Sequence, residues 1–112
     1  MATITTHVLD TARGKPAAGV TVTLEVLDGE GSRVIARGAT DDDGRCKTLT
    51  SGEGVPAGSY RIGFDTGAYF ARQGTETFFP RALIEFVVRD AGAHFHVPLL
   101  VAPFGYSTYR GS

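Results

Sequence analysis

The chain has very little cysteine and tryptophan. Its 112 residues include no tryptophan and one cysteine, Cys46, so no intrachain disulfide can form. Nothing in this composition indicates an oxidising compartment. The alternation of side chains directs Cys46 inward, which is typical of a small buried apolar residue rather than of a nucleophile. We therefore expect Cys46 to have a structural role.

Long apolar runs and an excess of one charge are also missing. Stretches such as residues 97–102 are far shorter than the roughly 20 residues of a membrane-spanning helix, and no cationic start precedes an apolar signal core. The 11 basic and 12 acidic residues give a formal net charge of -1. They form no cationic stripe of the kind that nucleic-acid-binding proteins carry. We therefore expect a cytoplasmic protein that binds neither membranes nor nucleic acid.

The composition is that of an ordinary globular domain, with 42% hydrophobic and 21% charged residues. At this length, folding buries roughly 60 to 70% of the surface that the unfolded chain exposes, which is enough for one hydrophobic core. The sequence shows no internal repeat. We expect residues 1–112 to form a single domain.

Apolar and polar residues alternate with period two along much of the chain, and this pattern predicts β-strands. In residues 3–9 the alternation directs Ile4 and Val8 to the core and His7 to the opposite face. Thr66 is predicted to cap a short helix over residues 66–72, with Gly74 as its left-handed stop. Further strands are predicted over residues 20–26, 33–40, 60–65 and 83–89, the last covered on both faces because apolar residues occupy adjacent positions.

The C-terminal part of the chain predicts a hairpin, with a strand over residues 93–102, a turn over 103–105 and a final strand over 106–112. Every second side chain of its first strand is apolar, so the two histidines between them leave the core together. The apolar face consists of Phe95, Val97, Leu99 and Val101, and the opposite face of His94, His96, Pro98 and Leu100. Short strands at this spacing predict an all-β sandwich with one small helix.

Three side chains on predicted polar faces or turns are candidates for chemistry. His7 and His96 would be solvated or line a groove, and imidazole is suited to acid–base catalysis near neutral pH. Arg45 follows a turn over residues 41–44 and offers a planar fork of donors to an anionic or carbonyl-rich ligand. Histidines without a role would show the same periodicity, and most arginines at turns are merely solvated. The pattern alone leaves both interpretations open.

The sequence favours neither a metal site nor a serine triad. His94 and His96 could hold two corners of a zinc site, but there is no second histidine pair and no Cys-x-x-Cys. Residues 41–43 indicate a turn rather than a calcium loop, and a Gly-x-Ser-x-Gly segment is missing. We expect no metal and no cofactor.

Five segments carry motifs that occur together in one family. They are Thr5-Thr6-His7-Val8-Leu9-Asp10-Thr11, Asp43-Gly44-Arg45, Phe78-Phe79-Pro80, His94-Phe95-His96-Val97-Pro98-Leu99-Leu100 and Tyr106-Ser107-Thr108-Tyr109-Arg110-Gly111-Ser112. In these motifs the chain resembles the 5-hydroxyisourate hydrolases, the enzymatic branch of the transthyretin-like proteins. The resemblance covers essentially the whole chain. Its most specific part is the ending Tyr-Arg-Gly-Ser, which the hormone-carrying transthyretin branch lacks. Phe95, Val101, Ala102 and Phe104 depart mildly from the usual family residues.

The resemblance implies a transthyretin-like (prealbumin-like) β-sandwich of two sheets with one short helix. It further implies hydrolysis of 5-hydroxyisourate to 2-oxo-4-hydroxy-4-carboxy-5-ureidoimidazoline in urate degradation, and a homotetramer, a dimer of dimers, that binds this small molecule between subunits. The implied catalytic residues are His7, Arg45, His96 and Ser112, and the implied substrate-binding residues are Arg45, Tyr109, Arg110, Gly111 and Ser112. No metal or cofactor is implied.

Two rival interpretations remain at this stage. A non-catalytic carrier of small ligands, of the transthyretin type, would share the tetramer but would catalyse no reaction; the two histidines argue against it. A structural or adhesive β-sandwich module ranks last, because such a module would have no use for the histidines or for the terminal Tyr-Arg-Gly-Ser motif. The fold alone does not separate these classes.

Overall fold

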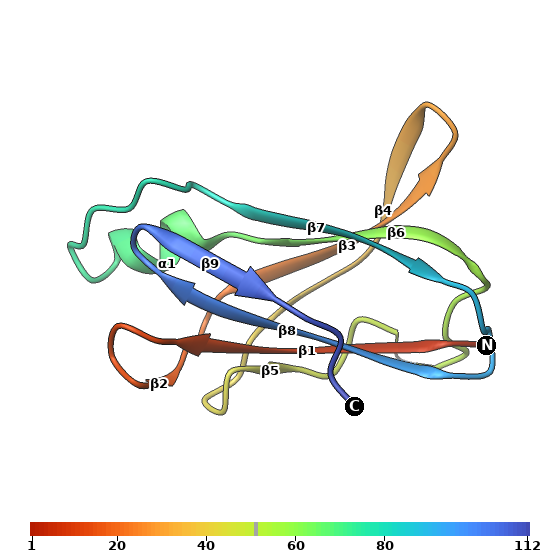
Figure 1. The fold of residues 1–112 in the computed structure, drawn as a ribbon, viewed down its shortest axis with the longest axis horizontal. Helices are drawn as coiled ribbons and strands as arrows, with labels where there is room; N and C mark the ends of the chain where they lie inside the picture. The colour runs from red at the N-terminus through yellow and green to blue at the C-terminus, as the bar shows by residue number, and fades with distance from the viewer. Residues whose placement is uncertain (51) are drawn as a thin grey trace.

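The computed structural model describes residues 1–50 and 52–112, which form two β-sheets and one short helix (Figure 1). The predicted long strands are present, and most of their ends lie within two residues of the expected positions. The all-β sandwich expected from the alternation is therefore confirmed. The first sheet has the order β2 (Lys15–Pro16), β1 (Thr3–Asp10), β8 (His94–Ala102) and β9 (Gly105–Thr108), and β5 (Arg45–Cys46) also pairs with β1. The second sheet has the order β4 (Gly31–Ala39), β3 (Thr21–Asp28), β6 (Gly58–Phe64) and β7 (Ala82–Val88).

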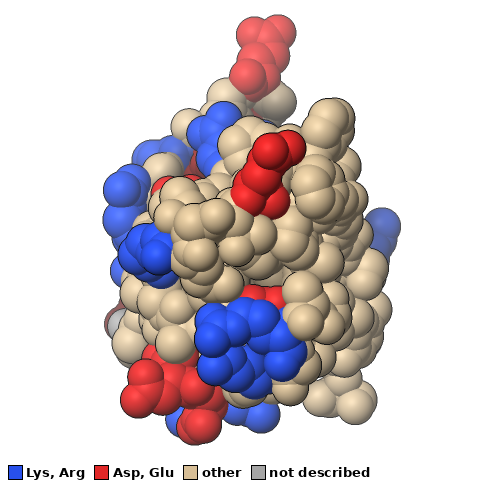
Figure 2. Space-filling model, turned by 90° about the vertical axis from the view of Figure 1, so that its left-hand side faces the viewer, with Lys and Arg blue, Asp and Glu red and all other residues tan. Residues whose placement is uncertain are grey.

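The two sheets lie in two layers, and the helix α1 (Thr66–Ala71) lies at the end of the sandwich away from the N-terminus (Figure 1). The hairpin of β3 and β4 extends beyond the body of the sandwich. Figure 2 views the molecule from the α1 end and shows basic and acidic side chains in adjoining patches beside a broad uncharged area. Among residues 1–50 and 52–112, no helix is both long and apolar enough to cross a membrane.

The strand β1 pairs with β8 in parallel, although the two segments stand at opposite ends of the sequence. Its register sets Thr3 opposite His94, Thr5 opposite His96, and His7 opposite Pro98. Because the side chains of a strand alternate, residues that are partners in this register project from the same face of the sheet. The pairing therefore gathers the first and last polar motifs of the chain on one surface.

Alternation also explains the core. Ile4 and Val8 on β1 are fully buried, and His7 between them is half-buried on the opposite face, as the sequence predicted. On β8 the buried face is formed by Phe95, Val97, Leu99 and Val101, again as predicted. From the second sheet the core receives Val22, Leu24, Tyr60, Ile62 and Phe64. The inner faces of both sheets thus pack together in the manner of a β-sandwich.

The prediction that residues 83–89 are covered on both faces was wrong for this chain. The strand β7 lies at the edge of the second sheet, and Leu83 and Val87 on its outer side are 48% and 44% exposed. Ala82 and Val88 are buried, while Ile84 and Phe86 are partly buried against the core. Adjacent apolar residues therefore mark a strand with one packed face and one exposed apolar face.

The start of the helix also differs from the prediction. Asp65, not Thr66, is the N-cap, and its side chain accepts a hydrogen bond from the amide of Ala68. A carboxylate satisfies the free amides of a first turn at least as well as a hydroxyl does. Thr66 is 2% exposed inside the first turn. Gly74 has a φ of 68°, so the left-handed conformation expected after the helix is present.

The last strand is shorter than predicted. β9 ends at Thr108, and the following residues continue along β8 in the same antiparallel register, where Gly111 forms an isolated bridge with His96. The guanidinium of Arg110 lies 4.5 Å from the centre of the Phe95 ring, which favours this path by a cation–π contact. The register of β9 with β8 thus carries the end of the chain to His96.

Candidate functional site

The parallel pair β1–β8 supplies two columns of outward-facing polar side chains. Thr3 and Thr5 form one column, and His94 and His96 form the other. Because Ile4 and the apolar face of β8 are anchored in the core, the positions of these four polar residues are fixed by the packing beneath them. The site therefore lies on a rigid sheet rather than on a loop.

Hydrogen bonds connect the two columns. The Thr3 hydroxyl lies 2.6 Å from Nδ1 of His94, and the Thr5 hydroxyl lies 3.1 Å from Nε2 of the same ring. The Thr5 hydroxyl is also 2.8 Å from Nδ1 of His96. One hydroxyl thus bridges two imidazoles. This arrangement engages Nδ1 of His96 and leaves its Nε2 for a ligand.

Arg45 reaches the site through the turn that precedes β5. Oδ1 of Asp41 accepts hydrogen bonds from the amides of Asp43 and Arg45 at 2.9 and 3.0 Å, and these bonds hold the pKa of Asp41 below its usual value. Gly44 has a φ of 76°, and a Cβ at this position would lie 2.4 Å from the carbonyl oxygen of Val8. The turn therefore requires glycine, and it places Arg45 at the start of β5, as predicted.

The strand β5 pairs antiparallel with β1 and sets Arg45 opposite His7 and Cys46 opposite Thr6. Cys46 is 1% exposed and faces the interior, in agreement with the structural role expected for it. Arg45 is exposed on the outer side. His7 and Arg45 are consequently neighbours on the same surface as His96.

The end of the chain completes the arrangement. The amide of Gly111 donates a hydrogen bond of 2.8 Å to the carbonyl oxygen of His96. A Cβ at Gly111 would lie 2.7 Å from Cδ2 of the His96 ring, so the close approach depends on glycine. This contact brings Ser112 to the surface where His96 and Arg45 stand.

A hollow of about 540 Å³ lies between these elements. Arg45, His96 and Ser112, three of the four residues predicted as catalytic, line it directly. His7, the fourth, is not among the lining residues and is the partner of Arg45 across β1 and β5. The complete lining is Thr5, Thr6, Arg45, Lys47, His94, His96 and Ser112.

The surroundings of His96 favour its neutral form. Burial lowers its pKa, and the charges of Arg45, His7 and His94 lower that pKa further, while a hydrogen bond with the backbone of Thr5 has the opposite effect. An imidazole whose pKa lies below the usual value of about 6.5 is neutral at pH 7 and keeps a lone pair. His96 can therefore accept a proton, and Arg45 can stabilise a developing negative charge.

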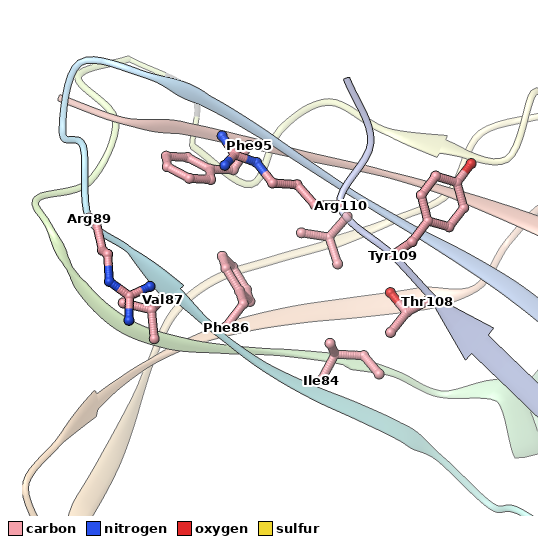
Figure 3. Close-up of a pocket in the computed structure, with 9 residues that line it drawn as sticks. Ile84, Phe86, Val87, Arg89, Phe95, Thr108, Tyr109 and Arg110 are labelled. Atoms are coloured by element: carbon pink, nitrogen blue, oxygen red, sulfur yellow. The ribbon is translucent and has the colours of Figure 1, made fainter.

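Tyr109 and Arg110 lie elsewhere in this chain. They line a different cavity, of about 360 Å³, at the edge between the two sheets. Figure 3 shows the Arg110 side chain over Phe95. Phe86 and Ile84, on β7, lie across the cavity from them, and Tyr109 lies to the right in this view. Gly111, another of the predicted substrate-binding residues, lies against His96.

Sequence reasoning gave Thr5, His94 and Lys47 no part in the site, although all three line the hollow. The alternation did set Thr5 and His94 on outward faces, but it did not reveal that their strands pair. Among residues 1–50 and 52–112, no group of three or more His, Cys, Asp or Glu side chains could hold a metal ion.

The strand order, the parallel β1–β8 pair and the helix before β7 define a transthyretin-like β-sandwich, with a histidine- and arginine-lined hollow on one outer face. The structure of sea bream transthyretin in complex with thyroxine matches with a TM-score of 0.90 and 33% identity, over 96% of this chain and 93% of that chain. The chain belongs to the HIUase/Transthyretin family, whose family model matches residues 4–111.

Two hydrolases of this family are more similar in sequence. The structure of Klebsiella pneumoniae 5-hydroxyisourate hydrolase has a TM-score of 0.88 and 47% identity, and the match covers 100% of this chain and 94% of that chain. The 5-hydroxyisourate hydrolase of Caulobacter vibrioides is 47% identical over 116 residues, which cover 100% of both proteins. The family resemblance drawn from the motifs is therefore confirmed.

Proposed function

We propose that this protein hydrolyses 5-hydroxyisourate to 2-oxo-4-hydroxy-4-carboxy-5-ureidoimidazoline. The observation that carries the proposal is the convergence of His96, Arg45 and Ser112 on one hollow, with His7 beside them. The full-length similarity to proteins named 5-hydroxyisourate hydrolase supports the same substrate.

The reaction needs a base and a group that stabilises negative charge. Water attacks an amide-like carbonyl of the six-membered ring, the carbon–nitrogen bond breaks, and the proton of the water ends on the departing ring nitrogen. No electrons are transferred to or from a cofactor. His96, with its lowered pKa, is neutral near pH 7 and takes the proton of the water at Nε2. His7 helps to hold that water.

Arg45 and Ser112 bind the substrate and orient the reacting groups. The guanidinium grips the carbonyl-rich ring and offsets the charge of the oxyanion as it forms. Ser112 supplies an oxygen that orients the water or the base. A positioned base of this kind contributes about 10² to 10⁴-fold to the rate. The four residues thus divide the work between proton transfer and charge stabilisation.

A transthyretin-type carrier is the alternative. The solved transthyretin has the same fold but 33% identity, against 47% for the Klebsiella hydrolase. A carrier also has no need for a neutral imidazole beside a guanidinium. These two observations favour the enzyme.

The test is direct. Urate oxidase generates 5-hydroxyisourate in the cuvette, and its ultraviolet absorbance is followed with and without the purified protein. We expect the decay to accelerate in proportion to the protein concentration. A decay rate equal to that of the uncatalysed reaction, at protein concentrations where ligand binding is detected, would support the carrier instead.

We further propose that residues 1–112 act as one hydrolase domain, in a cytoplasmic homotetramer that is a dimer of dimers, as the resemblance implies. The family model spans nearly this whole range. The hollow opens on the outer face of the first sheet, and Phe104, Leu83 and Val87 expose apolar surface that association would bury. Light scattering coupled to gel filtration gives the mass in solution, and a monomer with full activity would refute the assembly.

A further inference from the structure

The hydroxyl of Thr5 lies within hydrogen-bonding distance of the imidazoles of both His94 and His96. It is 2.8 Å from Nδ1 of His96 and 3.1 Å from Nε2 of His94. A hydroxyl has one proton to donate and lone pairs to accept with. If it donates to one ring, it must accept from an N–H of the other. The protonation states of the two histidines are therefore coupled through Thr5.

Two arrangements satisfy this chain of hydrogen bonds. In the first, Nδ1–H of His96 donates to Thr5, Thr5 donates to Nε2 of His94, and Nδ1–H of His94 donates to Thr3 at 2.6 Å. In the second, every donor and acceptor is reversed. Only the first leaves Nε2 of His96 with a lone pair, which is the state that a base needs.

We propose that Thr5 is a positioning residue, which holds His96 in the tautomer with a free Nε2 and, once Nε2 is protonated, relays the positive charge of His96 to the exposed His94 by transfer of the Nδ1 proton. The inference deepens the proposed hydrolysis and rests on it for its catalytic part. The tautomer control does not depend on the substrate.

The proton balance is simple. One proton, taken from water, binds Nε2 of His96. The Nδ1 proton of His96 moves to Thr5, the hydroxyl proton of Thr5 moves to Nε2 of His94, and His94 becomes the cation. His94 then releases one proton to solvent. The relay leaves His96 neutral, with its remaining proton on Nε2, and the substrate's carbonyl carbon bonded to the water oxygen. Release of the Nε2 proton to the leaving ring nitrogen, and return of a proton along the chain, restore the starting state.

Charge and exposure give this relay its direction. His96 is half-buried and faces Arg45 and Lys47 from β5 and the residue after it, His7 from β1, and Ser112 from the end of the chain. Burial and the positive charge of Arg45 disfavour a proton resting on His96. His94 is exposed on the same strand. The charge is therefore less costly on His94 than on His96.

The first experiment reads the tautomer without substrate. Long-range proton–nitrogen NMR spectra of protein labelled with ¹⁵N-histidine report which ring nitrogen of His96 carries the proton. We expect mainly the Nδ1–H form in the wild type and in Thr5→Ser, and a shift to the Nε2–H form, which free histidine favours, in Thr5→Val. Identical His96 nitrogen shifts in wild type and Thr5→Val would overturn the positioning role.

The second experiment measures turnover. Thr5→Val should lower kcat by about 10- to 100-fold with a smaller effect on KM, and Thr5→Ser should restore most of it. His94→Gln should lower kcat in dilute buffer, and added imidazole should recover it by accepting the proton directly. Thr21→Val, on β3 of the other sheet, is the matched control and should keep wild-type kcat.

The outcomes separate the inference from the proposed function. A tautomer that depends on Thr5 in a protein without hydrolase activity would leave the positioning role standing and remove the function. Hydrolysis with unchanged kcat in both Thr5→Val and His94→Gln would overturn the relay and leave the function standing.

Discussion

The amide of Gly111 donates a hydrogen bond to the backbone carbonyl of His96, at 2.8 Å. This single contact ties the end of the chain to the strand that carries the candidate base. It also places the α-carbon of Gly111 directly against the imidazole, since a Cβ there would be 2.7 Å from Cδ2 of that ring.

Gly111→Ala should therefore impair the site without unfolding the protein. The added methyl group must displace either the His96 ring or the chain end that carries Ser112. A misplacement of this kind costs up to about 100-fold in rate, so we expect kcat/KM to fall by about 10- to 100-fold. Gly31→Ala is the control, because nothing lies within 4 Å of its added Cβ. Equal kcat/KM in the two variants would show that the contact between Gly111 and His96 does not affect catalysis.

His96→Asn and His7→Asn should abolish most of the activity while the fold persists. Both side chains project from the outer face of the first sheet, so their loss removes no core packing. We expect a loss of about 10² to 10⁴-fold in kcat for His96→Asn and a change in unfolding free energy of less than about 1 kcal/mol. Ultraviolet assays and urea denaturation measure the two quantities. A collapsed fold would contradict the assignment of these histidines to the surface.

Local patterns were sufficient to predict which way these side chains point. Period-two alternation put His7 and His96 opposite the buried residues of β1 and β8, because alternation is a property of the extended backbone itself. The turn chemistry of Asp41 and Gly44 likewise indicated where Arg45 would stand.

What could not be predicted depends on contacts between distant segments. Thr5 and His96 are 91 positions apart, and nothing in either segment specifies the parallel register that joins them. Leu83 and Val87 are exposed because they project from the outer face of a two-layer sandwich, and a strand's own sequence does not encode how many layers cover it.

The pH dependence of activity should show the lowered pKa of His96. Burial and the charge of Arg45 favour the neutral ring, so the acid limb of kcat/KM should lie below the value of about 6.5 typical of free imidazole. The same shift makes stability depend on pH. The contribution of His96 to the unfolding free energy is complete above the pKa of this ring in the unfolded chain, and it is lost as the pH falls through the pKa of the ring in the folded protein. NMR titration of His96 measures its pKa directly. Arg45→Gln should raise that pKa, and a value at or above 6.5 in the wild type would contradict the account.

A buried carboxylate fastens the far end of β1 to the helix. Asp10 is fully buried, and its Oδ2 accepts a hydrogen bond of 2.8 Å from the hydroxyl of Tyr69 on α1. Its Oδ1 accepts from the amides of Ala12 and Arg13 at 3.1 Å each. Sequence reasoning gave Asp10 no role, because an acidic residue at a strand end is ordinarily exposed.

Tyr69→Phe should destabilise the fold and change its response to alkali. The variant leaves Oδ2 of Asp10 buried without its donor, which costs about 1 to 3 kcal/mol in unfolding free energy. Tyr109→Phe, at a position that is 57% exposed, is the control and should stay within about 0.5 kcal/mol of the wild type.

Burial and the hydrogen bond to Asp10 raise the pKa of Tyr69. The contribution of its hydroxyl to the unfolding free energy is therefore complete below the pKa of about 10 that tyrosine has in the unfolded chain, and it is lost as the pH rises through the pKa of Tyr69 in the folded protein. Urea denaturation from pH 7 upward should therefore show the wild type losing stability above pH 10 more steeply than Tyr69→Phe. Parallel curves for the two proteins would mean that the Tyr69 hydroxyl does not hold Asp10 in solution.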